Sequence, residues 1–186
     1  MLPAYPLVLA INSNNGAALT NTVTPTSILH GSGIGTLGGG WLQVGSKIKG
    51  LVRGRVSTLV TTPGTLTFDI RFGSIVVSAF GAIALNIVAQ TNAFFDLEFL
   101  IDVVSIGGTT SATALCTGRF VSRALLGSVA AASGGVGVMG LPDTAPVVGT
   151  GFDSTIAIPV NLFATWSVAS ASNSIQVHSS LIEFKV

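Results

Sequence analysis

Apolar and polar residues alternate with a period of two along several stretches of this chain. In residues 65–72, TLTFDIRF, apolar side chains fill the even positions and polar or charged ones the odd positions. The same pattern runs through residues 154–168, STIAIPVNLFATWSV. Successive side chains of a β-strand point to opposite faces, so this period is typical of strands with one buried face. No stretch shows the spacing of an amphipathic helix, and the alternation therefore predicts an all-β chain.

The number and spacing of these stretches predict the architecture. We count about eight to ten short strands separated by turns, and no helix long enough for a crossover connection. The 186 residues can bury one core, which predicts a single jelly-roll-like antiparallel β-sandwich. We expect the sandwich to span residues 47–186. Residues 1–46 carry no Lys, Arg, Asp or Glu, and we expect an extended N-terminal arm or loop region with short strands there. The Gly-rich stretches 31–40 and 124–142 are expected to be loops or arms.

A β-hairpin is expected around Gly107-Gly108, because this dipeptide readily adopts the backbone angles of two-residue turns. If those two residues form the loop, Phe99 lies opposite Cys116 on the buried face. The same register sets Asp96 against Arg119 on the exposed face. A single register that suits both faces is typical of true strand pairing.

Cations alternate along residues 47–58, KIKGLVRGRVST, in a chain of which only 8% is charged. The stripe consists of Lys47, Lys49, Arg53 and Arg55, and FFDLEFLID offers the outward acids Asp96, Glu98 and Asp102. Opposite charges across a sheet fix register and partner more than stability. The sequence leaves open whether the charges meet within one subunit or across a subunit interface, and a solvated charged face also explains the stripe. A net charge of +1 and a strand without aromatic residues both argue against nucleic acid as a partner.

Several large apolar residues fall on positions that the alternation assigns to the outside. They are Leu51, Leu59, Phe94, Leu100, Leu115 and Phe163. Such a set indicates buried interfaces and favours an obligate homo-oligomer whose contacts resemble a divided core. The interface candidates are therefore the charged residues of the two stripes, together with Arg119, Phe94, Leu100 and Phe163.

Residues that could carry chemistry are few and scattered. GIGTLG, residues 33–38, has the spacing of a dinucleotide-binding loop, but no acidic residue follows about 20 positions later, and we interpret it as a loop. Cys116 is the only cysteine and lies on the predicted buried face. His30 and His178 have no spacing that supplies a metal site or a nucleophile–base pair. We expect no enzymatic activity, no cofactor and no metal site.

The apolar stretch YPLVLAI, residues 5–11, is far shorter than the roughly 20 residues of a membrane span. No Lys or Arg precedes it, as a signal peptide would require. We therefore expect a soluble protein without a signal peptide, a transmembrane segment or a membrane partner.

Two stretches carry a resemblance to a known family: TTPGTLTFDIRFGSIVV and PVVGTGFDSTIAIPVNLFATWSVASASNSIQVHSSLIEF. They are similar to small virion structural proteins of tailed bacteriophages, over residues 48–186. The resemblance implies a β-rich head protein, a trimeric cement or decoration protein on the capsid exterior. Its implied partners are further copies of itself and the major capsid protein, whose shell it stabilises.

Two other functions remain open. One is a receptor- or carbohydrate-binding jelly roll on a tail tip or head fibre, for which Trp41, Asp143 and Asp153 are the candidate residues. The same aspartates are also typical of turns. The other is a major shell subunit, which would assemble by itself into closed particles.

Overall fold

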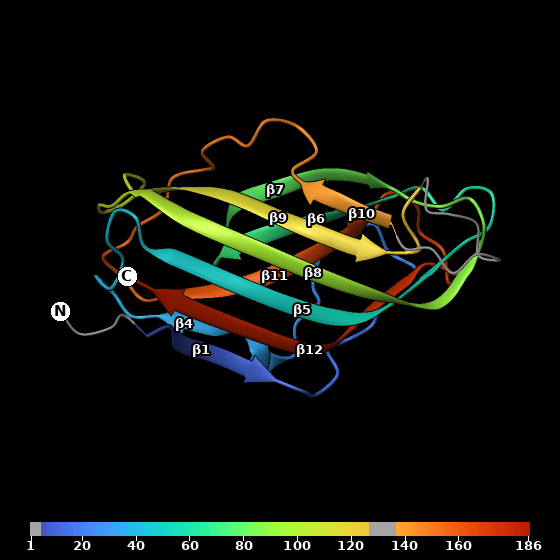
Figure 1. Cartoon of the computed structure of the whole chain (residues 1–186), viewed down its shortest axis with the longest axis horizontal. Coiled ribbons are helices and arrows are strands. Elements are labelled where there is room, and N and C mark those ends of the chain that lie inside the picture. Colours follow the sequence, from blue (N-terminus) through green and yellow to red (C-terminus); the bar gives the residue numbers. More distant parts are fainter. Residues whose placement is uncertain (1–4, 127–136) are drawn as a thin grey trace.

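The computed structural model describes residues 5–126 and 137–186, and these residues form two antiparallel β-sheets packed face to face (Figure 1). The seven-stranded sheet contains β1 (Leu7–Asn12), β2 (Leu19–Thr20), β5 (Lys47–Thr58), β8 (Gln90–Ser105), β9 (Thr113–Ser122), β10 (Gly137–Leu141) and β12 (Ser174–Lys185). The five-stranded sheet contains β3 (Thr26–Ser27), β4 (Gly35–Leu37), β6 (Thr65–Phe72), β7 (Ile75–Ala84) and β11 (Ile158–Trp166). A short 3₁₀ helix, η1 (Gly31–Gly33), precedes β4.

The strand order is that of a jelly roll. The first sheet runs β1-β12-β5-β8-β9-β10, with β2 also paired to β12. The second runs β3-β11-β6-β7, with β4 also paired to β11. Strands β1, β12, β5 and β8 therefore face β4, β11, β6 and β7, and β9 and β10 extend the first sheet at one edge. The predicted all-β jelly-roll sandwich is confirmed.

Residues 5–46 form short strands, as the sequence predicted, but these strands belong to the two sheets of the sandwich and not to a separate arm. β1 pairs with β12, and β4 pairs with β11, so this segment supplies strands to both sheets. Its residues Leu19, Leu37 and Leu42 are buried in the core. The absence of charge in this segment is consistent with its strand pairing and with the burial of these core residues.

The two Gly-rich stretches also contain strands where we expected only loops. Within 31–40, η1 and β4 are formed, and β4 is held by its pairing with β11. Within 124–142, residues 137–141 form β10, while 127–136 lie outside the described residues. Pairing with a neighbouring strand stabilises these segments in spite of their composition.

The core combines large aromatic side chains of one strand with glycines of its neighbours. Phe99 on β8 is fully buried and lies opposite Gly50 on β5 and Gly118 on β9. A Cβ atom built at Gly50 would lie 2.0 Å from Cζ of Phe99. At Gly54, a Cβ would lie 2.0 Å from a backbone carbonyl oxygen. These glycines leave the space that the rings and the neighbouring strand occupy.

The β8–β9 pairing differs in register from the prediction, although the residues face the predicted sides. Phe99 lies opposite Gly118 and not opposite Cys116, and Arg119 lies opposite Glu98 and not opposite Asp96. The two-residue loop does not form because the connection is held open by another part of the chain. The backbone N–H of Gly107 donates to Oγ of Ser154 at 2.9 Å, and the Ser154 N–H donates back to the Gly107 carbonyl at 2.9 Å.

Candidate interaction surface

The outer face of the seven-stranded sheet carries a ladder of charges on β5, β8 and β9. The β5–β8 register sets Lys47 opposite Asp102 and Arg53 opposite Asp96, and it leaves Glu98 diagonal to Lys49. The ion pairs are Lys47–Asp102, Lys49–Glu98 at 2.8 Å, Arg53–Asp96 at 3.0 Å and Arg119–Glu98 at 3.3 Å. The two stripes therefore pair with each other within one subunit.

Glu98 lies between two cations of this charge ladder. The hydrogen bond and the charge of Lys49, together with the charge of Arg119, lower the pKa of its carboxyl group in spite of partial burial. Arg55 has no acid opposite it. Its Nη2 donates to Oε1 of Gln176 at 2.7 Å, and Phe94 is its neighbour across the strand pair.

The charge ladder determines strand register more than stability. Exposed ion pairs of this kind each contribute about 0–1 kcal/mol, because both charges remain hydrated and mobile. Like charges brought opposite by a shifted register would repel each other. Because Lys47, Lys49 and Arg53 are paired with acids, the charge ladder leaves no large unmatched basic patch on β5.

The outward apolar residues that the sequence singled out do not form one surface. Phe163 lies on the five-stranded sheet, where the guanidinium of Arg71 sits 4.1 Å from its ring centroid. Arg71 is also paired with Asp69 at 3.1 Å, so Phe163 is covered by a charged group of its own subunit. Leu115 forms a bridge with Val148 in a following loop. The contact with Arg71 explains the outward position of Phe163 without any partner, and Leu115 is half-buried beside the loop.

Three more of these residues lie on the charged sheet. Leu100 is half-buried between the ion pairs, opposite Lys49. Phe94 is 56% exposed near the other end of β8. Leu51 is half-buried and continues a cross-strand row of apolar side chains through Leu181 to Ile11 on β1.

Exposed apolar side chains gather at the β1 edge of the seven-stranded sheet, which forms the lower rim of the molecule in Figure 1. We call Tyr5, Leu7, Val8 and Ile11 the β1 rim. Tyr5 is 81% exposed and Ile11 is 73% exposed. The alternation pattern did not indicate these residues, although the uncharged run YPLVLAI was a signal for them.

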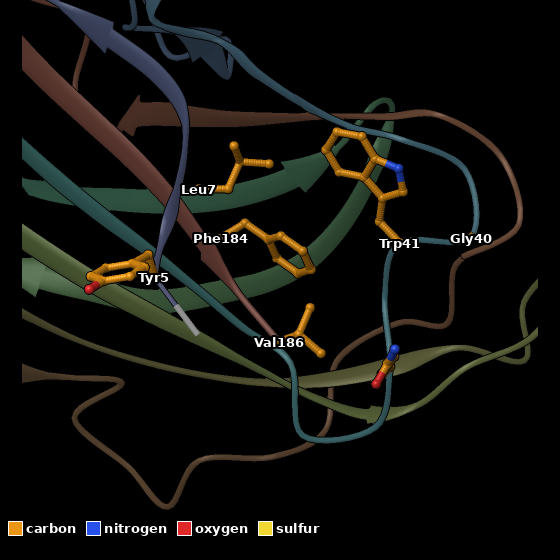
Figure 2. A pocket seen from close by; sticks show the side chains of 7 residues that line it. Tyr5, Leu7, Gly40, Trp41, Phe184 and Val186 are labelled. Carbon is orange, nitrogen blue, oxygen red and sulfur yellow. The ribbon is translucent and has the colours of Figure 1, made fainter. Parts of the chain in front are cut away.

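A hollow of about 590 Å³ lies at one end of the β1 rim (Figure 2). Figure 2 shows Phe184 between Tyr5 and Trp41, with Val186 beside it. The rings of Trp41 and Phe184 are stacked, with centroids 6.4 Å apart and planes 25° apart. The lining of this aromatic hollow is Tyr5, Leu7, Gly40, Trp41, Gln43, Phe184 and Val186. These residues come from three distant parts of the chain, and none of them carries a charged side chain.

A second hollow, of about 290 Å³, lies at the other end of β1. Its apolar wall is the row of Ile11, Leu181 and Leu51, and Arg53 borders it. We call it the aliphatic hollow. The β1 rim therefore has a hollow beside each of its ends.

The residues considered for chemistry are not brought together. Cys116 is buried, and burial raises the pKa of its thiol to about 12. Nδ1 of His30 is hydrogen-bonded to Oγ of Ser32, and Nδ1 of His178 to Oδ1 of Asn15. In the part of the chain that the structure describes, no group of three His, Cys, Asp or Glu side chains could hold a metal ion.

Asp143 and Asp153 lie apart from the aromatic hollow. Oδ1 of Asp153 accepts hydrogen bonds from the N–H and the hydroxyl of Thr155, which lower the pKa of its carboxyl group. This is the arrangement of an aspartate that stabilises a turn. Asp143 borders a different hollow, next to Met139 and Ala82.

No helix among the described residues is long and apolar enough to span a bilayer.

Fold and surface together define a jelly-roll sandwich with a self-neutralised charge ladder and an uncharged apolar rim. A scan against models of known protein families found no match, and a search of curated proteins also found none. Among solved structures, the chain is similar to the CBM2 module of the evolved Dit of Lactobacillus casei BL23 phage J-1. The two are 13% identical with a TM-score of 0.33, over 82% of this chain and 68% of the other. A likeness of this size does not define a shared function.

Proposed function

We propose that this chain is a non-enzymatic virion structural protein, a capsid decoration or cement protein. It binds the outer surface of a capsid as a homotrimer and stabilises the shell. The observation that carries the proposal is the gathering of exposed apolar side chains on the β1 rim and around its two hollows. A contiguous apolar surface of this kind marks a site of contact with other protein. The resemblance of residues 48–186 to small virion proteins of tailed phages supports the same function.

The charge ladder supports a protein partner over nucleic acid. Three of the four cations on β5 are already paired with acids of the same subunit, and the fourth is bonded to Gln176. Phosphate binding depends on cations that are free to replace counterions. The ladder offers few such cations, whereas the β1 rim offers apolar surface.

Shell stabilisation needs no chemistry. Pressure from packaged DNA loads the seams between capsid subunits, and a protein that binds only the assembled shell shifts the equilibrium toward assembly. At a concentration of 100 times Kd, binding of this kind contributes about 2.7 kcal/mol per site.

The test is sedimentation of the purified protein with assembled heads of the phage that encodes it, and separately with dissociated shell subunits. We expect saturable binding to the heads, little binding to the subunits, and heads that withstand higher temperature when the protein is bound. Failure to sediment with heads would overturn the proposal. A truncated chain that lacks residues 1–40 cannot be used to locate the binding surface, because the truncation removes β1 and β4 from the jelly roll.

A second candidate, a receptor- or carbohydrate-binding module of a tail tip or head fibre, is favoured by the aromatic hollow. Tyr5 is 81% exposed and Trp41 is 46% exposed, so their ring faces can stack on the apolar face of a sugar. Asp143 and Asp153 do not line this hollow, so its polar side-chain groups are the amide of Gln43 and the hydroxyl of Tyr5. A hit on a glycan array that is lost in Trp41→Ala would favour this candidate.

A further inference from the structure

We propose that the β1 edge is a self-association surface, at which β1 of one copy pairs antiparallel with β1 of a second copy. This contact joins the seven-stranded sheets of two subunits. Where the trimer of the proposed function forms, the contact links neighbouring trimers, and to that extent the inference rests on the proposed function. The β1 pairing itself requires no capsid.

The backbone of β1 supplies the first reason. β1 is the terminal strand of its sheet and is paired on one side only, with β12. Among the described residues, no hydrogen bond outside the sheet pairing joins its backbone to another segment. The N–H and C=O groups on the free side of such a strand are a template for one more strand.

The edges of the five-stranded sheet are protected in ways that β1 is not, whereas β10, at the opposite edge of the seven-stranded sheet, has five residues and is followed by Pro142. β7 has two register shifts against β6, and Gly81 within it has a φ of +80°. β3 and β4 have only two and three residues. β1 has six residues and a single register shift, between Val8 and Ala10, and it contains neither a charge nor a proline. Charges, prolines, bulges and short length are the usual devices against edge pairing.

The chemistry of the rim identifies a second copy as the occupant. An uncharged apolar strand pairs best with a strand that is equally uncharged and apolar, and residues 1–46 contain no Lys, Arg, Asp or Glu. Two β1 strands related by a two-fold axis therefore meet without like-charge repulsion. An antiparallel pair places Val8 of one copy beside Ile11 of the other. Both side chains are exposed in the single subunit, at 49% and 73%.

The aliphatic hollow extends this contact across the outer face. In this register, the row formed by Ile11, Leu181 and Leu51 in one subunit continues into Val8 of the second copy. Burial of such a row removes apolar area from water and so stabilises the contact. The isologous symmetry makes every favourable contact occur twice.

The experiment is the solution mass of the full chain by light scattering over a range of concentrations, for wild type, Ile11→Lys and Ile87→Lys. Ile87 is 58% exposed and hydrogen-bonded through its carbonyl to Thr61, away from β1, so it is the matched control. We expect Ile11→Lys to halve the mass, because each lysine would bring a charge against the apolar Val8 of the other copy. Ile87→Lys is expected to keep the wild-type mass.

Each outcome decides between the two proposals. A hexamer that becomes a trimer supports both the β1 pairing and the trimer. A dimer that becomes a monomer supports the β1 pairing and contradicts the trimer. A trimer whose mass Ile11→Lys leaves unchanged overturns the β1 pairing and leaves the trimer standing. A wild-type monomer at all concentrations overturns both.

A cross-linking variant tests the same contact if Ile11→Lys is destabilised. Ile11→Cys should be linked into dimers by a short bismaleimide, and Ile87→Cys should not. The natural Cys116 does not interfere, because it is buried. Equal linking of the two variants, or none, would overturn the β1 pairing.

Discussion

Replacing Gly50 by alanine tests the claim that glycines on β5 make room for the aromatic core. The new Cβ would lie 2.0, 2.2 and 2.6 Å from three ring atoms of Phe99, and that ring has no exposed surface toward which it could move. Overpacking a core costs about 1–3 kcal/mol, and three overlaps indicate the upper end. Alanine also restricts the unfolded chain, which returns about 0.4–1 kcal/mol. The expected net loss is about 2 kcal/mol, or a Tm lower by about 4–8 °C.

The assay is urea unfolding at fixed protein concentration, with Gly140→Ala as control. Gly140 is also a strand glycine, but a Cβ there meets nothing within 4 Å. Its replacement should change stability by less than about 0.5 kcal/mol. Phe99→Leu should relieve the clash, so the double variant should be more stable than the sum of the single changes predicts, by about 1–2 kcal/mol. Additive effects, or equal results for the two glycines, would refute the reasoning.

Three further predictions follow from single side chains. Asn173 is fully buried, and its side chain accepts from the Leu59 N–H at 2.8 Å and donates to the Pro63 carbonyl at 3.0 Å. Asn173→Ala should therefore cost about 2–3 kcal/mol in urea unfolding, because a buried donor and acceptor lose their partners; a loss below about 0.5 kcal/mol would contradict this. Burial raises the pKa of Cys116 from 9.0 to about 12, so this thiol ionises at a lower pH in the unfolded chain than in the folded one. The free energy of unfolding should therefore fall as the pH rises above 9.0, and Cys116→Ala should remove that slope. The native thiol should also resist a thiol reagent until the chain unfolds. The pKa of Glu98 is lowered, so its ion pairs add stability at pH values above its ordinary pKa of 4.5, and this stability should disappear as the pH falls through the lowered pKa. In a pH titration of unfolding, Glu98→Gln should make the free energy of unfolding less dependent on pH in the acid range. An unchanged acid dependence would contradict the role of Lys49.

The alternation of the sequence predicted faces well and register less well. Phe99 and Cys116 are buried and Arg119 is exposed, as their positions in the pattern indicated. The β8–β9 register depends on the length of the connection, which is determined by hydrogen bonds to Ser154 far along the chain. A local turn signal such as Gly107-Gly108 contains no information about that distant partner.

The interaction surface was only partly predictable for the same reason. Complementary charge stripes on β5 and β8 could be recognised, and the structure pairs them within one subunit. The aromatic hollow joins Tyr5, Trp41 and Phe184. Pairing of β1 with β12 brings the N-terminal segment beside Phe184, and Trp41 stacks on that ring from the segment after β4. The uncharged N-terminal segment was expected to be an arm because composition alone does not distinguish a segment that pairs in a sheet from one that lies on a partner.

The solution mass of the purified protein at low and high salt tests the central claim most directly. Apolar contacts are insensitive to salt screening, whereas exposed ion pairs are weakened by it. We predict an oligomer built from trimers, with the same mass at both salt concentrations. A monomer at either salt concentration would contradict the proposed trimer and would favour the binding-module function of the aromatic hollow.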